Sequence, residues 1–169
     1  MKSQVRKTLL DAARTLLRSA SIYDLSVGKM AAEAGVARPT AYRYFSHPRD
    51  IVGALAEETL VEIRNAICDT QQPSKAAAYA RAAVEILTSD STVNRQVILH
   101  ASVQARDGKW IAQTNTPEGL FAAWDMNSKE ARISLTYFRG AMYSWATGFF
   151  SDKEFAEETE RAIAMRDIR

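Results

Sequence analysis

The sequence contains little cysteine, glycine and proline. Its 169 residues include 1 Cys, 7 Gly and 4 Pro. A single cysteine, Cys68, excludes an internal disulfide framework and any zinc site built from several cysteines. The shortage of glycine and proline argues against a loop-rich or all-β chain, because both need many turns. With 47% apolar and 25% charged residues, the composition is that of a globular protein rather than a disordered one.

Long apolar runs and short enzyme motifs are also missing. No stretch approaches 18 consecutive apolar residues, so no membrane span is predicted. Residues 1–11 are polar and lack the apolar core of a secretory signal, so we expect a soluble, cytoplasmic protein. No G-x-S-x-G, H-E-x-x-H or glycine-rich phosphate loop occurs, and two histidines 53 positions apart offer no metal cluster. We therefore do not expect an enzyme.

The chain also has almost no excess of one charge, since 22 Lys and Arg stand against 20 Asp and Glu. The net charge of +2 nevertheless combines two unlike parts. Residues 1–49 hold nine basic and three acidic residues, a net +6, whereas residues 50–169 hold 13 basic and 17 acidic residues, a net −4. A basic half is a hint of nucleic-acid contact, although on charge alone a solvated basic face is an equally good interpretation.

Helical periodicity, by contrast, is abundant. In the first segment Val5, Leu9, Ala13 and Leu16 recur at helical spacing and form one apolar stripe. Similar patterns predict helices over residues 3–19, 27–34, 38–45, 48–69, 75–88, 92–104, 118–126, 128–150 and 152–164. We therefore predict an all-α protein.

Residues 25–45 carry the most informative motif, LSVGKMAAEAGVARPTAYRYF. Ser26 is of the type that caps a helix N-terminus, and Gly35 suits the left-handed residue that often follows a helix. Two helices joined by a short turn containing glycine form a helix-turn-helix. Ala31, four residues before Gly35, is expected on the inner face, where a small side chain lets the two helices cross closely.

The second helix of this motif has the side chains that DNA reading requires. Arg38 stands at its N-terminal end, from which side chains reach base edges, and arginine can bond O6 and N7 of guanine together. Pro39 and Thr40 offer apolar and hydroxyl surface to a thymine methyl or a phosphate. Tyr42 and Arg43 are expected to hold phosphates, contacts that set register without reading sequence directly.

These residues resemble the DNA-binding domain of TetR-type (tetracycline-repressor-like) bacterial transcription regulators. The resemblance covers residues 6–60 and rests on Ala12-Ala13, Leu16-Leu17, Ser26-Val27, Met30-Ala31, Ala34-Gly35-Val36, Thr40, Tyr42-Arg43-Tyr44-Phe45 and Asp50-Ile51. The sequence departs from the family at Ala20-Ser21, where glycine is usual, and at Pro48, where the family has a phosphate-contacting lysine. Arg49 is the substitute that we expect for that lysine. Gly28 is an unusual choice early in a helix, because glycine disfavours helix.

The resemblance implies a three-helix DNA-binding domain at residues 1–47. A connecting helix at 48–69 then opens a helical effector-binding and dimerisation domain, residues 48–169. The family dimerises through its last two long helices, here 128–150 and 152–164. A bacterial homodimeric regulator is implied, by default a repressor that binds a palindromic operator and is released by a small molecule. The rival interpretations are a helical small-molecule binder without operator binding, or an enzyme.

Two sets of site residues follow from these arguments. The candidate DNA contacts are Ser26, Lys29, Arg38, Pro39, Thr40, Tyr42, Arg43, His47 and Arg49. The candidate effector pocket is drawn from the aromatic-rich second half and consists of His100, Trp110, Phe121, Trp124, Tyr137 and Met142. A place in the core or the dimer interface is the stronger alternative for each aromatic residue, since aromatics at helical spacing usually pack a core. No metal, cofactor or membrane partner is predicted.

Overall fold

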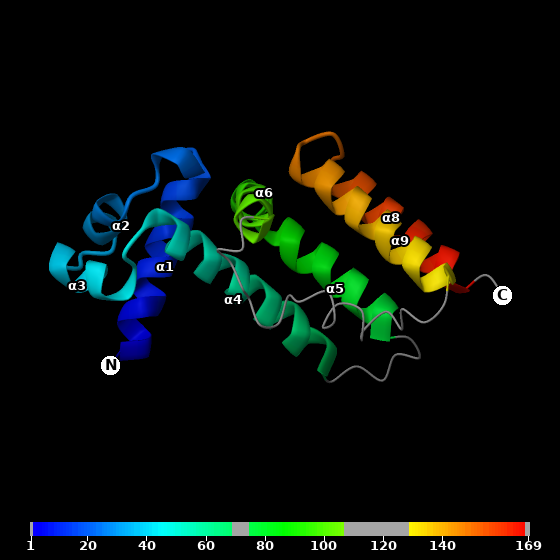
Figure 1. Ribbon diagram of the computed structural model, residues 1–169, viewed down its shortest axis with the longest axis horizontal. Helices are drawn as coiled ribbons and strands as arrows, with labels where there is room; N and C mark the ends of the chain where they lie inside the picture. The colour runs from blue at the N-terminus through cyan, green and yellow to red at the C-terminus, as the bar shows by residue number, and fades with distance from the viewer. Residues whose placement is uncertain (1, 69–74, 107–128, 168–169) are drawn as a thin grey trace.

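The computed structural model describes residues 2–68, 75–106 and 129–167 (Figure 1). Over these ranges the chain forms eight α-helices and one 3-10 helix and no strand, which confirms the predicted all-α class. In chain order the elements are α1 (Lys2–Ser19), η1 (Ile22–Asp24), α2 (Val27–Glu33), α3 (Arg38–Tyr44), α4 (Pro48–Cys68), α5 (Lys75–Ser89), α6 (Ser91–Arg106), α8 (Lys129–Ala146) and α9 (Asp152–Asp167). None of the described helices is long and apolar enough to cross a membrane.

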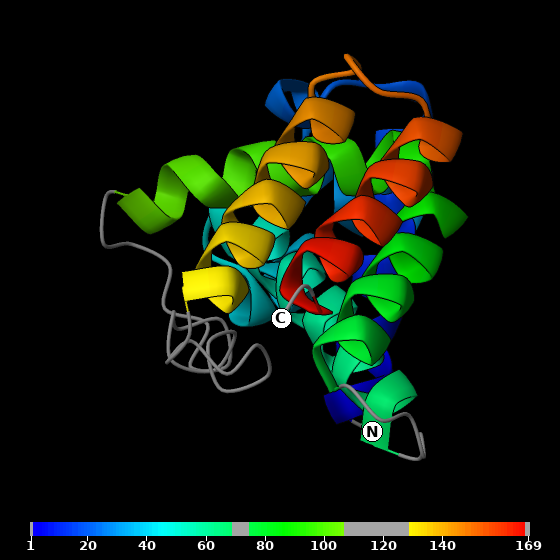
Figure 2. The same cartoon turned by 90° about the vertical axis from the view of Figure 1, so that its right-hand side faces the viewer.

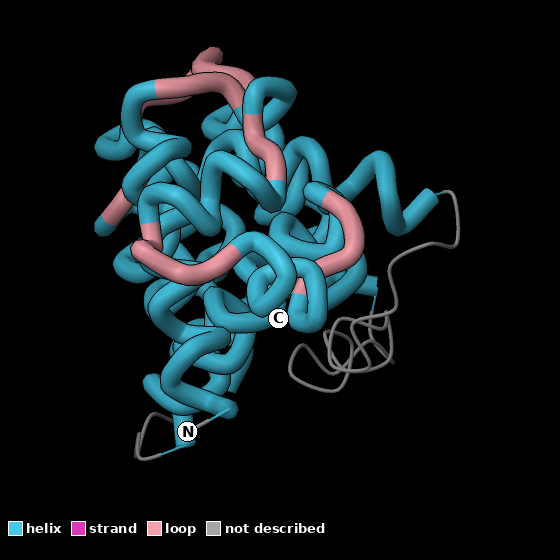
Figure 3. The backbone as a smooth tube through the Cα atoms, turned by 90° about the vertical axis from the view of Figure 1, so that its left-hand side faces the viewer, coloured by secondary structure: helices cyan, strands magenta, loops and turns pink. Residues whose placement is uncertain are grey.

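The helices form an N-terminal group and a C-terminal bundle (Figure 1). α1, α2 and α3 lie together at one end, and α8 and α9 form an antiparallel pair at the other. α4 leads out of the first group, and α5 packs between α4 and α9. α6 crosses the middle of the molecule and contacts α1 and α4 as well as α8. Figure 2 views the molecule from the α8–α9 side and Figure 3 from the α1–α3 side.

Local sequence signals set the ends of α2 as predicted. Ser26 is the N-cap, and its hydroxyl accepts the amide of Lys29 at 3.1 Å. Gly35 follows the C-cap with a φ of +63°, which a residue without a Cβ adopts at no steric cost. The amide of Val36 then bonds back to the carbonyl of Ala31 at 2.9 Å, satisfying an otherwise orphaned helix carbonyl.

The end of α8 differs from the expected one. The apolar pattern predicts a helix to residue 150, but α8 stops at Ala146. Gly148 has a φ of +82°, and the amide of Phe149 bonds back to the carbonyl of Ser144 at 2.9 Å, so glycine ends the helix as Gly35 does after α2. α6 and α9 run two and three residues further than expected. The helix expected over 118–126 lies outside the described residues.

Two apolar cores hold the helices together. The N-terminal core joins α1, η1, α2, α3 and the first half of α4, and it also includes Val93, Val97 and Ala101 of α6. The C-terminal core joins α5, α8, α9 and the later part of α4 around Trp145 and Phe155. These two rings are fully buried and stack with their centroids 5.2 Å apart. The long-range contribution of α6 means that the N-terminal core is completed by a helix from the second half of the chain.

Candidate nucleic-acid interface

Small buried residues fix the packing of α2 against α3. Met30 and Ala31 of α2 and Ala41 of α3 are completely buried, and Phe45 directly after α3 is 3% exposed. All four belong to the N-terminal core. A larger side chain at Ala31 would strain this packed site and shift α3. The inner face of α3 is therefore firmly seated, as the helix-turn-helix pattern predicts.

The opposite face of α3 is basic and open to solvent. Arg38, Pro39, Tyr42 and Arg43 are exposed, Tyr42 to 52%, whereas Thr40 is half-buried. Arg38 and Tyr42 are four positions apart, and so are Pro39 and Arg43. This spacing places all four on one side of the helix. Within residues 2–68, 75–106 and 129–167, neither Arg38 nor Arg43 has a hydrogen bond or ion pair. Both guanidinium groups thus remain available to a phosphate or a base edge.

The candidate DNA contacts Ser26 and Lys29, at the start of α2, already form hydrogen bonds with nearby backbone groups. The hydroxyl of Ser26 caps α2, and the ammonium of Lys29 donates to the carbonyl of Asp24 at 2.9 Å. Lys29 is exposed and Ser26 is half-buried. A DNA phosphate would have to share or replace these local hydrogen bonds, which distinguishes both residues from Arg38 and Arg43.

The two candidates at the start of α4 meet at one acidic residue. The backbone amide of His47 donates to the carboxylate of Asp50 at 2.8 Å. Arg49 Nε lies 3.8 Å from the other carboxylate oxygen of Asp50. Both side chains are exposed. Exposed pairs at this distance contribute little, so the Arg49 guanidinium can turn toward another anion at small cost.

α1 is also basic, but its arginines are paired with acidic residues from later elements. Arg6 and Arg14 lie 3.7 and 3.5 Å from the two carboxylate oxygens of Glu58 on α4. Arg18 lies 2.9 Å from Asp90, between α5 and α6. These pairs neutralise part of the +6 charge of residues 1–49 within the fold. The sequence gives no signal for them, because the partners stand 44 to 72 positions apart.

One side of α6 is hydrogen-bonded directly to the end of α1. The Gln96 side-chain oxygen accepts the amide of Ile22 at 2.7 Å. Its nitrogen donates to the carbonyls of Leu17 at 2.9 Å and Ala20 at 3.4 Å. The last carbonyls of a helix lack partners within it, so Gln96 satisfies groups at the α1 terminus from another part of the chain. Our sequence reasoning missed this residue, for which no local pattern exists.

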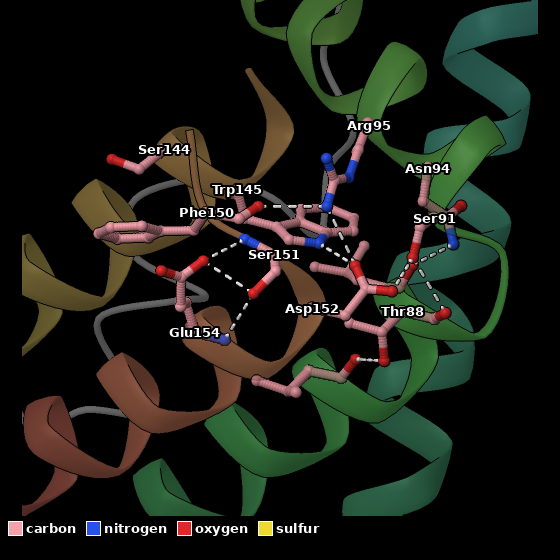
Figure 4. Close-up of polar contacts among 12 residues, drawn as sticks. Thr88, Ser91, Asn94, Arg95, Ser144, Trp145, Phe150, Ser151, Asp152 and Glu154 are labelled. Atoms are coloured by element: carbon pink, nitrogen blue, oxygen red, sulfur yellow. Dashed lines mark hydrogen bonds and ion pairs between the residues drawn. The ribbon is translucent and has the colours of Figure 1, made fainter. Parts of the chain in front are cut away.

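The neighbouring residue of α6 is anchored to the α8–α9 turn instead (Figure 4). Arg95 donates to Asp152 at 3.1 Å and to the carbonyl of Phe150 at 3.2 Å. Trp145 and Ser91 also donate to the Asp152 carboxylate, at 2.6 and 2.8 Å. Burial alone would raise the pKa of Asp152, but the hydrogen bonds from Trp145, Ser91 and Arg95 and the charge of Arg95 together lower it. α6 therefore holds both the N-terminal group and the C-terminal bundle.

The effector-pocket candidates lie in different surroundings. Trp110, Phe121 and Trp124 fall outside the described residues. The His100 ring packs edge-on against Tyr23 of η1, with centroids 6.1 Å apart. The Tyr137 hydroxyl donates to Glu158 of α9; this hydrogen bond, burial and the charge of Glu158 raise the pKa of Tyr137. Met142 is half-buried against the C-terminal core. The pocket stays a prediction.

The all-α fold, the seated α2–α3 pair and the basic face of α3 define a helix-turn-helix protein of the DNA-binding class. Residues 9–55 match the family model of bacterial regulatory proteins of the tetR family. This match over residues 9–55 confirms the resemblance to the TetR family that the sequence shows in this region.

Two solved structures have the same overall fold. One is a TetR transcriptional regulator from Rhodococcus sp. RHA1, 17% identical, with a TM-score of 0.66 over 98% of this chain and 96% of that one. The other is the TetR-like transcriptional regulator LfrR from Mycobacterium smegmatis in complex with proflavine, 22% identical, with a TM-score of 0.60 over 97% of each chain. No curated protein sequence matches this chain. The chain thus has the fold of TetR-family transcriptional regulators over nearly its whole length.

Proposed function

We propose that the protein is a transcription regulator that binds a palindromic DNA operator through α3. The observation that carries the proposal is the exposed face of α3, on which the Arg38 and Arg43 side chains bond to none of the described residues. Arg38, at the N-terminal end of α3, reads a guanine. The proposed phosphate contacts are Tyr42, Arg43, Ser26, Lys29, His47 and Arg49. Pro39 and Thr40 lie between them and contact a thymine methyl or a phosphate.

The proposed active form is a homodimer paired through α8 and α9. The outer face of α8 supports this pairing. Ile133 is 48% exposed there, and among the described residues no atom beyond the neighbouring backbone of α8 lies within 4 Å of the Cβ position at Gly140. A two-fold axis along this helix pair gives two copies of α3 that read two equivalent half-sites. Adjacent half-sites on B-DNA are about 34–36 Å apart, which is the spacing that we expect for the operator.

Effector control is proposed to pass through α6. A small molecule in the domain formed by residues 48–169 releases the DNA by favouring a second arrangement of the dimer, which is a population shift. The anchors of α6 support this route, because Arg95 contacts the α8–α9 turn while Gln96 contacts the end of α1. The complex of LfrR with proflavine supports small-molecule binding by proteins of this fold.

A gel shift with the DNA upstream of the protein's own gene tests the proposal. We expect a complex that is displaced by unlabelled upstream DNA and persists with the same mass of random-sequence DNA. Arg64→Ala, which removes an exposed arginine on α4 outside the proposed interface, should leave the complex intact. Equal displacement by both DNAs would contradict operator binding and favour a small-molecule binder without an operator.

A further inference from the structure

The guanidinium of Arg38, the one arginine that we assign to base reading, lies over the vacant side-chain position of Gly28. Gly28 is the second residue of α2, where glycine weakens a helix relative to alanine. A methyl group at Gly28 would lie 3.6 Å from Arg38 Cζ, 3.6 Å from Nε and 3.7 Å from Nη2. The Arg38 side chain therefore leaves α3 and folds across the first turn of α2, over the position that has no side chain.

The three distances define how the guanidinium lies. If the Cβ position at Gly28 lay beyond the edge of the guanidinium plane, it would be closer to Nε and Nη2 than to the central Cζ. Because Cζ is as near as either nitrogen, the face of the guanidinium is turned toward Gly28. The plane of the group then lies along α2, and its N–H groups point sideways, in the directions that bind a base edge or a phosphate.

The seat of Arg38, as we call it, is the space over the first turn of α2 that Gly28 leaves empty, and the guanidinium lies 3.6 Å from the position of the missing Cβ. The Arg38 side chain is exposed, and none of the residues in the described part of the chain forms an ion pair or hydrogen bond with it. A free arginine samples many rotamers, and ordering them on binding weakens affinity. A guanidinium confined to the space over Gly28 would lose less freedom when it reaches a base.

We propose that Gly28 is a positioning residue for Arg38. The missing side chain leaves room over α2 for the guanidinium, and the place of the guanidinium in this space sets the direction in which Arg38 presents its N–H groups to a guanine. The proposal deepens the function above and rests on it, since it assumes that Arg38 reads a base. It assigns a role in specificity to a residue that itself makes no base contact.

Substitutions of different size at position 28 test whether Gly28 positions Arg38. In Gly28→Ala the added methyl stays at ordinary van der Waals distance from the guanidinium face, so Arg38 keeps its seat. In Gly28→Leu the atoms beyond Cβ occupy the space of the guanidinium and displace it. Alanine and leucine both have a higher helix propensity than glycine, so both variants should fold. Thermal melting of each variant checks this.

The experiment uses an operator selected from random-sequence DNA by the wild-type protein. Binding to this operator and to versions with each guanine replaced is measured for wild type, Gly28→Ala, Gly28→Leu, Arg38→Ala and Gly28→Leu/Arg38→Ala. We expect Gly28→Ala to keep the wild-type preference within about two-fold and Gly28→Leu to lose about ten-fold at the guanine that Arg38→Ala identifies. The double variant should match Arg38→Ala, because Gly28 acts through Arg38.

Two results overturn the proposal. One is an unchanged guanine preference in Gly28→Leu. The other is an equal loss of operator affinity from Gly28→Leu in the presence and in the absence of Arg38, which would show that the glycine serves close approach of the DNA itself.

The NMR signal of the Arg38 Nε–H group in the free protein gives a readout that needs no operator. It should shift in Gly28→Leu and stay close to wild type in Gly28→Ala. If the wild-type protein selects no operator, the proposed function is contradicted. If the Arg38 Nε–H signal does not shift in Gly28→Leu, only the positioning role of Gly28 is contradicted.

Discussion

α1 and α3 are both basic helices of the same N-terminal domain, yet they use their arginines differently. Arg14 and Arg18 of α1 are paired with Glu58 and Asp90, at 3.5 and 2.9 Å. Arg38 and Arg43 of α3 have no such partner among the residues that the structure describes. The comparison shows that a local count of basic residues does not locate a DNA contact. Within the N-terminal group, the guanidinium groups of Arg38 and Arg43 are available to phosphates and bases, whereas those of Arg14 and Arg18 are paired within the fold.

The largest effect is expected from Arg38→Ala. If Arg38 reads a guanine, its loss costs about 1–3 kcal/mol of discrimination at that base pair. Binding to operators that differ only at single guanines measures this cost. The preference should collapse at one position per half-site and persist at the others. A uniform loss at every position would show that Arg38 is a phosphate contact and would weaken the contrast with Arg43.

Gln96→Ala should affect α1 rather than α3. The substitution leaves the amide of Ile22 and the carbonyls at the end of α1 without their side-chain partner. Because this region is only partly buried, water can replace some of the bonds, and we expect a loss of about 1–2 kcal/mol in the free energy of unfolding. Denaturant unfolding measures the loss. Gln4→Ala on the exposed side of α1 is the matched control and should change stability by less than about 0.5 kcal/mol.

Arg43→Ala is expected to weaken all DNA binding by the same factor. An exposed contact to a phosphate contributes up to about 1 kcal/mol, and its loss should lower the slope of log affinity against log salt by about 0.9. Titrations of operator and random DNA at several salt concentrations check both values. An unchanged slope, or a loss confined to the operator, would contradict the phosphate role. Arg64→Ala should leave the slope as it is.

Arg14→Ala should have the smallest effect, and on stability alone. Its pair with Glu58 joins α1 to α4, and the Arg14 side chain is 18% exposed. Pairs of this kind contribute about 0.2–1 kcal/mol to folding. A double-mutant cycle with Glu58→Ala isolates the coupling. Operator preference should not change, and a loss of preference in Arg14→Ala would place α1 at the DNA after all.

The sequence predicts the parts of this fold that depend on neighbouring residues. Ser26 and Gly35 end α2 through contacts within a few positions, and the apolar period of α1 follows from its own residues. Gly148 carries the same signal as Gly35, but the apolar residues around it continue the helical pattern and mask the end of α8. The candidate DNA contacts on α3 could likewise be named from the sequence, because they lie in one short motif, and they stay a prediction.

Contacts between distant residues could not be predicted in this way. The pairing of Arg18 with Asp90 and the bonds of Gln96 to the end of α1 link positions more than 70 apart, and nothing near either residue marks them. Gly28 and Arg38 stand only ten positions apart, but the position of the Arg38 guanidinium over the vacant side-chain position of Gly28 depends on how α2 crosses α3. The candidate site could therefore be named from the sequence as a set of side chains, most of them on α3, whereas their surroundings had to come from the folded structure.

The central claim is that α3 reads DNA while α1, which is also basic, serves the fold. The most direct test is the ratio of operator affinity to random-DNA affinity, measured at one salt concentration for wild type, Arg14→Ala and Arg38→Ala. The account predicts that Arg14→Ala keeps the wild-type ratio within about two-fold and that Arg38→Ala lowers it by about 5- to 150-fold, the equivalent of about 1–3 kcal/mol. Equal ratios for the two variants would contradict it.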